Sequence, residues 1–193
     1  MKTLLIMRHG KSSWDDPKLA DRERALTKRG VKSSLTIGEL VAEKELVPQR
    51  IISSTAVRAI ETANLVSQKC GCESTLVGAD ELYLAEPDAY LSLLRGLPDD
   101  LERVMVVGHN PGLEMLLQML SGEIETLATA VLAHVVLPIE SWKELKSDTE
   151  GHLVEIWRPK ELAAAQEEKE SPKKHKHAKK GEGEKEGKKH KKK

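Results

Sequence analysis

The sequence contains no phenylalanine and few other aromatic residues, so its core must be aliphatic. Three Trp and two Tyr are the aromatic side chains among 193 residues. Protein modules that bind single-stranded nucleic acid stack the bases on aromatic side chains, so we do not expect the body of this chain to be one. Long apolar runs are also absent, since no segment approaches the roughly 18 apolar residues of a membrane span. The apolar run before Arg8 is four residues long, too short for the roughly 7–15 residues of a secretory signal. We therefore expect a cytoplasmic protein with no membrane span.

Cysteine is almost absent as well. The two cysteines, Cys70 and Cys72, lie one residue apart, which does not make a disulfide framework. A structural zinc site uses four ligands of the Cys or His type, and no such spacing is present. We expect neither a metal nor another cofactor.

The formal net charge is zero, but the charges are divided unevenly along the chain. Residues 171–193 hold eleven Lys and three Glu, a net charge of +8, so the other 170 residues carry −8. The basic segment has no apolar periodicity and cannot bury enough surface to offset the entropy of ordering. We predict a folded domain over residues 1–160 and a charged tail over residues 161–193, disordered from Ser171 onward. Glu161–Glu170 has the composition of a helical extension.

Apolar periodicity in the body predicts strands that alternate with helices. Strands are expected at residues 3–7, 50–53, 75–77, 103–107, 130–137 and 153–157, and helices at residues 28–44, 56–69, 87–94 and 113–120. This alternation is typical of an α/β fold with helices on both faces of a sheet, a three-layer α/β/α sandwich.

Two histidines stand directly after strongly apolar strands. His9 follows the first strand and His109 follows the strand at residues 103–107. Because the carboxyl ends of parallel strands form the ligand crevice of such sheets, both imidazoles are expected in one pocket. Arg8 adjoins His9, and Arg58 begins the helix after the second strand. Guanidinium forks fit phosphate oxygens, so the group suits a phosphoryl substrate with an imidazole as nucleophile.

Four stretches in this order resemble the histidine phosphatase superfamily, and within it the small phosphohistidine phosphatase (SixA-type) branch. The resemblance covers about residues 1–158. Its motifs are Met7-Arg8-His9-Gly10-Lys11-Ser12-Ser13-Trp14, Arg24-Ala25-Leu26-Thr27-Lys28-Arg29-Gly30, Ser53-Ser54-Thr55-Ala56-Val57-Arg58-Ala59-Ile60-Glu61-Thr62-Ala63 and Val107-Gly108-His109-Asn110-Pro111-Gly112. The resemblance implies a phosphoglycerate-mutase-like fold with a mostly parallel, mixed sheet.

The resemblance also implies a mechanism. His9 would attack phosphorus to give a phosphohistidine intermediate, which water would then hydrolyse. The phosphoryl oxygens would be held by side chains from all four stretches, namely Arg8, Arg24, Arg58 and His109. Arg22 is an alternative to Arg24, because the segment around both is rich in charge. Asn110 is a further phosphate-site candidate, and either its side chain or a main-chain carbonyl would orient His9. No metal is needed, since three arginines supply positive charge.

The general acid is an open choice. Relatives that hydrolyse phosphate monoesters protonate the leaving alkoxide with a carboxylic acid, and Glu81 is the candidate here. A candidate acid must lie within hydrogen-bond reach of the leaving group. A phosphohistidine substrate needs this proton less, because its leaving group is an imidazole like the nucleophile.

Several functions compete at this stage. The first is a metal-independent phosphatase, acting on protein phosphohistidine or on a small phosphorylated metabolite. The second is a mutase-like phosphotransferase, which the short chain disfavours. The third is a weakly active or inactive domain whose Lys/His tail binds polyanions through counterion release, although the tail is equally consistent with a solubilising segment. We expect a monomer.

Overall fold

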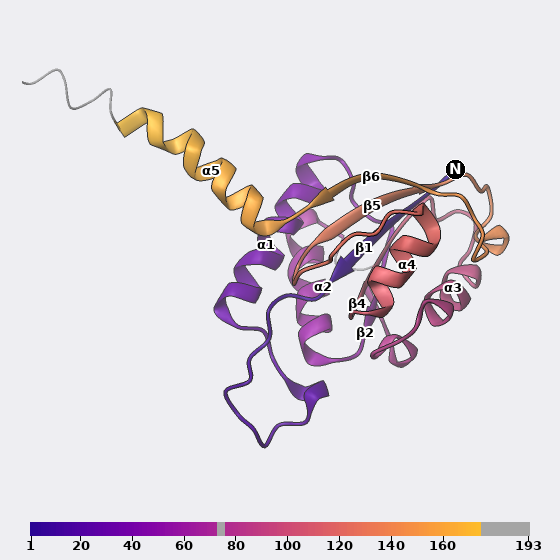
Figure 1. Cartoon of the computed structure of the whole chain (residues 1–193), viewed down its shortest axis with the longest axis horizontal. Coiled ribbons are helices and arrows are strands. Elements are labelled where there is room, and N and C mark those ends of the chain that lie inside the picture. The colour runs from indigo at the N-terminus through magenta and orange to yellow at the C-terminus, as the bar shows by residue number, and fades with distance from the viewer. Residues whose placement is uncertain (73–75, 175–193) are drawn as a thin grey trace, which may run out of the picture. The chain divides into compact units, whose positions relative to one another are not determined.

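A computed structural model describes residues 1–72 and 76–174, and within them an α/β domain followed by a C-terminal helix (Figure 1). The elements are β1 (Lys2–Arg8), α1 (Lys28–Glu43), β2 (Arg50–Ser54), α2 (Val57–Cys70), β3 (Leu76–Ala79), α3 (Pro87–Arg95), β4 (Arg103–Gly108), α4 (Gly112–Ser121), β5 (Leu132–Leu137), β6 (His152–Trp157) and α5 (Pro159–Lys174). Every helix and strand expected in the body is present, with ends shifted by two residues at most.

The strands form one mixed sheet in the order β3-β2-β4-β1-β5-β6. β1, β2, β3 and β4 are mutually parallel, whereas β5 runs antiparallel to β1 and β6 runs antiparallel to β5. β1 lies next to β4 with Arg8 opposite Gly108. The two strands that precede His9 and His109 are therefore neighbours and end at the same edge of the sheet.

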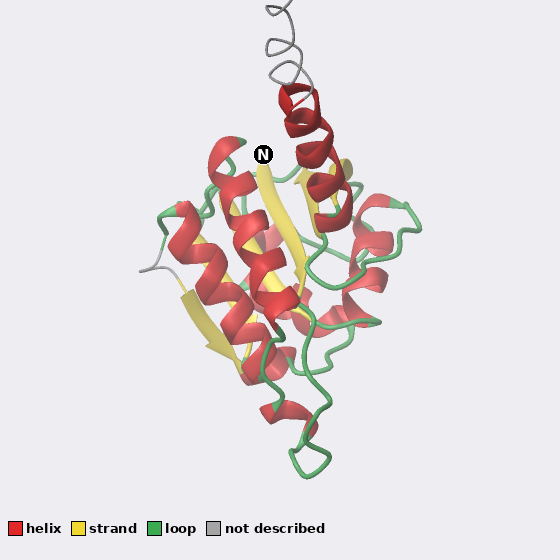
Figure 2. Cartoon of the chain, turned by 90° about the vertical axis from the view of Figure 1, so that its left-hand side faces the viewer, coloured by secondary structure: helices red, strands yellow, loops and turns green. Residues whose placement is uncertain are grey.

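Helices cover both faces of the sheet. Helices α1 and α2 pack against each other on one face, and α3 and α4 lie on the opposite face (Figures 1 and 2). Thr27 caps α1 as a side-chain acceptor for the Gly30 N–H, which satisfies one of the helix's unpaired donors. The expected three-layer α/β/α fold with a mixed sheet is confirmed.

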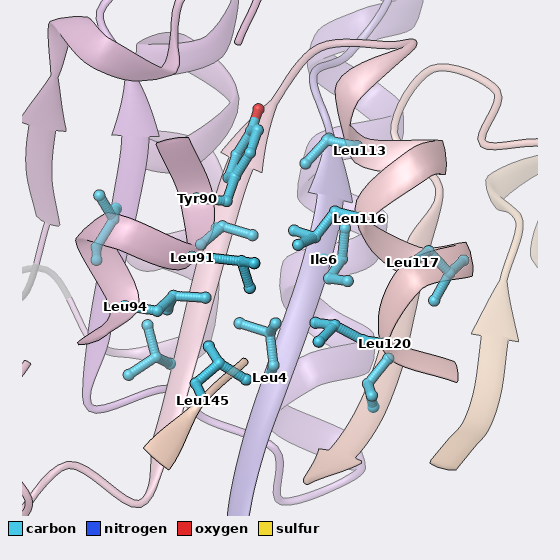
Figure 3. Packing of buried hydrophobic residues seen from close by; sticks show 14 of the residues in the cluster. Leu4, Ile6, Tyr90, Leu91, Leu94, Leu113, Leu116, Leu117, Leu120 and Leu145 are labelled. Carbon is cyan, nitrogen blue, oxygen red and sulfur yellow. The ribbon is translucent and has the colours of Figure 1, made fainter. Parts of the chain in front are cut away.

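The core is aliphatic, as the composition requires. Leu4 and Ile6 of β1 are fully buried against α3 and α4, where Leu91, Leu94 and Leu116 meet them (Figure 3). The intervening residues of β1 are buried too, and because side chains alternate along a strand they face α1 and α2. Burial of each such side chain contributes about 1.5–3 kcal/mol to the stability of the folded state. This packing on both faces fixes the end of β1, and with it the position of Arg8.

Many predicted boundaries differ by one residue, and three differences are larger or fall at the edge of the described chain. The strand expected from Ala130 begins at Leu132, because Ala130 has a φ of 62°, in the left-handed region that ends extended structure. Thr75, expected in the third strand, lies outside the described residues, and β3 is Leu76–Ala79. The helix expected to end at Glu170 extends to Lys174, so the first four residues of the segment expected to be disordered are helical.

The chain divides into two units, Met1–Pro159 and Lys160–Lys193. The second contains most of α5, and its residues from 175 onward, where most of the basic tail lies, are outside the described residues. In the described part of the chain, no helix is long and apolar enough to cross a bilayer.

Candidate active site

The candidate site lies at the carboxyl ends of β1, β2 and β4. β1 ends at Arg8 and leads into His9, β4 leads into His109, and β2 ends at Ser54. A pocket of about 240 Å³ opens there. Its lining residues come from loops at this edge of the sheet and from the start of α2: Arg8, His9, Lys11, Ser12, Trp14, Arg24, Arg58, Leu84, His109, Asn110 and Thr129. The structure thus brings together six of the seven residues predicted for the site.

The imidazole of His9 is buried and held in one tautomer. Its Nδ1 lies 2.7 Å from the carbonyl oxygen of Gly10, and its Nε2 lies 3.3 Å from Nε of Arg58. A carbonyl oxygen only accepts hydrogen bonds, so Nδ1 carries the hydrogen and Nε2 keeps its lone pair. Burial, assisted by the positive charges of Arg58, Arg8 and Arg24, lowers the pKa of His9 to about 4. His9 is therefore neutral at pH 7, with Nε2 available as a nucleophile.

His109 lies beside His9, with the two ring centroids 5.0 Å apart. Its Nε2 is 2.8 Å from Oγ of Ser54, and its Nδ1 is 3.4 Å from Nη2 of Arg58. Burial, together with the neighbouring His9 and Arg58, lowers the pKa of His109 to about 3. Since Arg58 can only donate, Nδ1 is the acceptor and Nε2 donates to Ser54. Both imidazoles are thus neutral in the unliganded site.

Arg8 and Arg58 bring two guanidinium groups to the pocket. Arg58 is 4% exposed and reaches both histidines. Arg8 donates from Nη1 to the carbonyl of Leu127, 2.8 Å away, while its buried Nε has no hydrogen-bond partner among the described residues. Burial lowers the pKa of Arg8, yet arginine stays protonated in proteins. An unpaired buried donor is costly, and the guanidinium that carries it lines the pocket.

Arg24 and Arg22 differ in their position relative to the pocket. Arg24 is 8% exposed and lines the pocket, with its guanidinium 3.2 Å from the ring centroid of Trp14. Arg22 is exposed and pairs with Asp80 and Thr55, away from the pocket lining. The structure therefore brings Arg24 to the site, as the motif predicted.

Glu81 is the predicted site residue that the structure does not bring to the pocket. Residues Asp80–Leu82 form a 3-10 turn in which Leu82 is buried in the core and Glu81 is exposed. Glu81 lines a different and larger cavity of about 640 Å³, between β3 and α3. In the short turn, burial of Leu82 directs Glu81 away from the histidines. This geometry does not support a role for Glu81 as general acid.

Asn110 lies in the pocket but does not orient His9. Its Nδ2 donates to Oε1 of Glu114 at 2.7 Å and to the carbonyl of Leu127 at 2.9 Å. Its buried Oδ1 has no partner among the described residues. Of the two alternatives for orienting His9, the structure selects the main-chain carbonyl of Gly10.

Sequence reasoning missed four polar residues around the site. Ser54 bonds His109, and Thr62 accepts the N–H of Gly10 at 2.9 Å. Asp21 accepts hydrogen bonds from the Tyr83 hydroxyl and from Nη2 of Arg58. Ser54 ends a parallel strand, so the rule that found the histidines could have found it. Thr62 lies one helical turn after Arg58, which is a weaker signal.

Comparison with known proteins places the chain in a family. A model of the histidine phosphatase superfamily (branch 1) matches residues 4–82. An uncharacterized chloroplastic protein of Arabidopsis thaliana is 30% identical over 152 residues, which cover 74% of this chain and 70% of that protein. The chain belongs to the histidine phosphatase superfamily. Its phosphatase character, expected from the four motifs, is thereby confirmed.

Within the histidine phosphatase superfamily, the SixA-type branch fits best. A protein assigned as the phosphohistidine phosphatase SixA of Agrobacterium tumefaciens is 27% identical, with a TM-score of 0.70, and the match covers 82% of this chain and 98% of that one. A 2,3-bisphosphoglycerate-dependent phosphoglycerate mutase of Clavibacter michiganensis is 36% identical over 74 residues, but these are 29% of the mutase. The SixA-type branch and the phosphoglycerate-mutase-like fold are confirmed.

Proposed function

We propose that this chain is a protein phosphohistidine phosphatase that forms a phosphohistidine on His9. The observation that carries the proposal is the lining of the pocket. Among the described residues, eleven side chains line it, and none is a carboxylate. A phosphatase that must protonate a leaving alkoxide needs an acid at this place.

Two carboxylates, Glu81 and Asp21, are candidates for a general acid, and neither fits that role. Glu81 lines the other cavity. Asp21 lies next to the site, but hydrogen bonds from Tyr83, Arg24 and Arg58 outweigh its partial desolvation and lower the pKa of this carboxyl to about 2. Asp21 is therefore ionised at pH 7 and has no proton to give. An imidazole leaving group suits such a site, because phosphoryl transfer then runs between two similar nitrogens.

In the proposed reaction, Nε2 of His9 attacks phosphorus in line as the bond from phosphorus to the substrate nitrogen breaks. Arg8, Arg24 and Arg58 hold the phosphoryl oxygens, on which charge spreads in the transition state. His109 joins them as a donor once the charge of the bound anion favours its protonated form. The substrate reacts with the other nitrogen of its ring protonated, so its imidazole leaves neutral with the electron pair of the broken bond, while the new bond to phosphorus makes the His9 ring cationic. Water then attacks the phosphohistidine, and inorganic phosphate departs as His9 is restored.

The size and rim of the pocket support a substrate in which a small phosphorylated side chain belongs to a protein. A volume of about 240 Å³ is below the roughly 300–1,000 Å³ of pockets that enclose whole small-molecule ligands. Two apolar side chains at the pocket are exposed, Trp14 by 70% and Leu84 by 56%. Leu84 has a φ of 50°, a conformation that costs a branched residue energy and is often found at functional sites.

The test compares substrates without added metal and in the presence of EDTA. Wild-type protein and His9→Ala would be assayed on a phosphohistidine-bearing protein and on a panel of phosphate monoesters. We expect turnover of phosphohistidine to exceed that of the esters, and the variant to lose about 10⁴-fold or more in kcat, as for removal of a nucleophile. A preference for esters would replace the proposal by a metabolite phosphatase. Equal activity of the variant would exclude His9 as nucleophile.

Three accompanying expectations remain predictions. They are a cytoplasmic location, a monomeric state and contact between the basic tail and polyanions. The tail residues concerned lie largely outside the described residues. Sedimentation of the full chain would test the monomeric state. Its retention on a polyphosphate column at two salt concentrations would test the contact with polyanions.

A further inference from the structure

Asp21 is the acidic residue at which the segments of the site converge. It lies in the 3-10 turn Asp21–Glu23, within the long connection between β1 and α1. Its Oδ1 accepts from Nη1 of Arg24 at 2.7 Å, and its Oδ2 accepts from Nη2 of Arg58 at 2.8 Å. The hydroxyl of Tyr83 donates to Oδ2 at 2.8 Å, and Nη1 of Arg58 donates to the Asp21 carbonyl at 2.5 Å.

Both arginines belong to the pocket lining, and each has contacts besides those with Asp21; Arg24 donates from Nε to the Ser13 carbonyl at 2.8 Å and from Nη2 to Oγ of Ser12 at 2.7 Å. Arg24 and Arg58 line the pocket, whereas Asp21 does not. Nε of Arg58 faces His9 at 3.3 Å, and its Nη2 also reaches His109 at 3.4 Å. The carboxylate therefore holds each guanidinium without itself being part of the pocket lining.

Contacts of this kind order the two guanidinium groups before an anion binds. An arginine side chain has about 2 kcal/mol of rotamer entropy, and an anion that had to order two of them would bind less tightly. Donors already fixed in place stabilise a transition state without reorganisation. The negative charge also offsets the repulsion between neighbouring guanidinium groups.

Tyr83 extends the same arrangement to the second histidine. While its hydroxyl donates to Asp21, its ring meets His109 edge-on, with centroids 5.6 Å apart. One carboxylate thus connects the β1–α1 loop, α2 and the segment after the Asp80–Leu82 turn.

We propose that Asp21 is a positioning residue that aligns Arg24 and Arg58 for the phosphoryl group, with Tyr83 as its support. The proposal rests on the proposed function only in naming that group, because its main readout is the binding of an anion. It assigns no proton transfer to Asp21.

The test uses the full-length chain with inorganic phosphate as the probe. Phosphate binding would be measured by calorimetry for wild type, Asp21→Asn and Tyr83→Phe, together with kcat and KM for phosphoramidate, a small compound with a phosphorus–nitrogen bond. Asp16→Asn is the matched control. It removes a carboxylate from the same loop, and among the described residues that carboxylate accepts from the backbone N–H of Lys18 alone. Thermal unfolding would report whether each variant folds.

We expect Asp21→Asn to weaken phosphate binding and to lower kcat/KM by about 10-fold or more, the order expected for loss of a charge-assisted hydrogen bond. Tyr83→Phe should have a smaller effect, and no further effect when combined with Asp21→Asn. Asp16→Asn should resemble wild type. Equal phosphate binding by the two Asp variants, or tighter binding by Asp21→Asn, would overturn the inference.

The two proposals fail in distinguishable ways. If wild type and His9→Ala turned over phosphoramidate and phosphohistidine equally, the proposed function would fail while the phosphate-binding comparison still tested Asp21. If wild type were active and Asp21→Asn bound phosphate like Asp16→Asn, only the role of Asp21 would fail.

Discussion

At the scale of single residues, the site depends on two buried imidazoles that stay neutral among positive charges. The Gly10 carbonyl holds the hydrogen on Nδ1 of His9, and the Ser54 hydroxyl occupies Nε2 of His109. Neither contact follows from the residue types alone. The neutral state has the same cause in both rings, because burial and nearby guanidinium groups disfavour a further positive charge.

The lowered pKa of His9 predicts a loss of stability in mild acid. Its pKa in the folded state, about 4, lies below the roughly 6.5 of an unfolded chain. The unfolded chain therefore takes up the proton first as the pH falls, so stability is complete above about pH 6.5 and declines toward pH 4. From pH 7 to pH 5 we expect wild type to lose about 2 kcal/mol more unfolding free energy than His9→Gln, which cannot titrate there.

Urea unfolding at the two pH values, monitored by circular dichroism, would measure this difference. Gln is chosen because its amide can still donate to the Gly10 carbonyl. If both proteins lost the same free energy, His9 would titrate as an ordinary histidine and would be largely protonated in acidic buffers.

At the scale of elements, the end of β4 is shaped by close packing against α3. A Cβ added to Gly108 would overlap the hydroxyl of Tyr90, a fully buried residue of α3. Glycine therefore lets α3 approach the strand that carries His109 into the pocket. The parallel pairing of Gly108 with Arg8 then aligns His109 with His9.

This packing predicts that Gly108→Ala destabilises the fold and that a second change restores it. Overpacking of this kind costs about 1–3 kcal/mol. Tyr90→Phe removes the hydroxyl that the new methyl group meets, so the double variant should recover most of the lost unfolding free energy. Chemical denaturation of the two single variants and the double variant would measure the coupling. Additive losses would show that the strain lies elsewhere in the strand.

At the scale of the whole molecule, the site belongs to one of the two units. Every residue that lines the pocket lies within Met1–Pro159. The sequence carries −8 over residues 1–170 and +8 over residues 171–193, and the basic part contributes none of the lining residues that the structure describes. Such a charge run acts on association and solubility and leaves the fold unaffected.

A chain that ends at Lys174 should keep its catalytic activity and lose its affinity for polyanions. We expect kcat/KM for phosphoramidate to stay within about 2-fold of the full chain, while salt-sensitive binding to polyphosphate disappears. Steady-state kinetics and a filter-binding assay at two salt concentrations would measure the two properties. A large fall in kcat/KM would show that the tail takes part in the reaction.

The pattern of the sequence was sufficient for the α/β fold and for most of the site. Apolar runs located the strands, and the polar residues after them, His9 and His109, were placed correctly because parallel strands end at one edge. The same rule placed Arg58, which begins the helix after the second strand, and the motif order supported Arg24. These inferences depend on local pattern and strand polarity, which a sequence carries directly.

Other features were decided by tertiary structure, because they depend on which way a side chain turns. Glu81 lies in the expected segment, yet burial of Leu82 in the same short turn directs it into another cavity. Asp21 looked like part of a solvated charge cluster, and only the fold brings it to Arg24, Arg58 and Tyr83. By itself, the sequence located the arginines and histidines that line the pocket, namely Arg8, His9, Arg24, Arg58 and His109. Three-dimensional packing decided that no carboxylic acid lines that pocket in the described chain, since side-chain direction is set by contacts between distant segments.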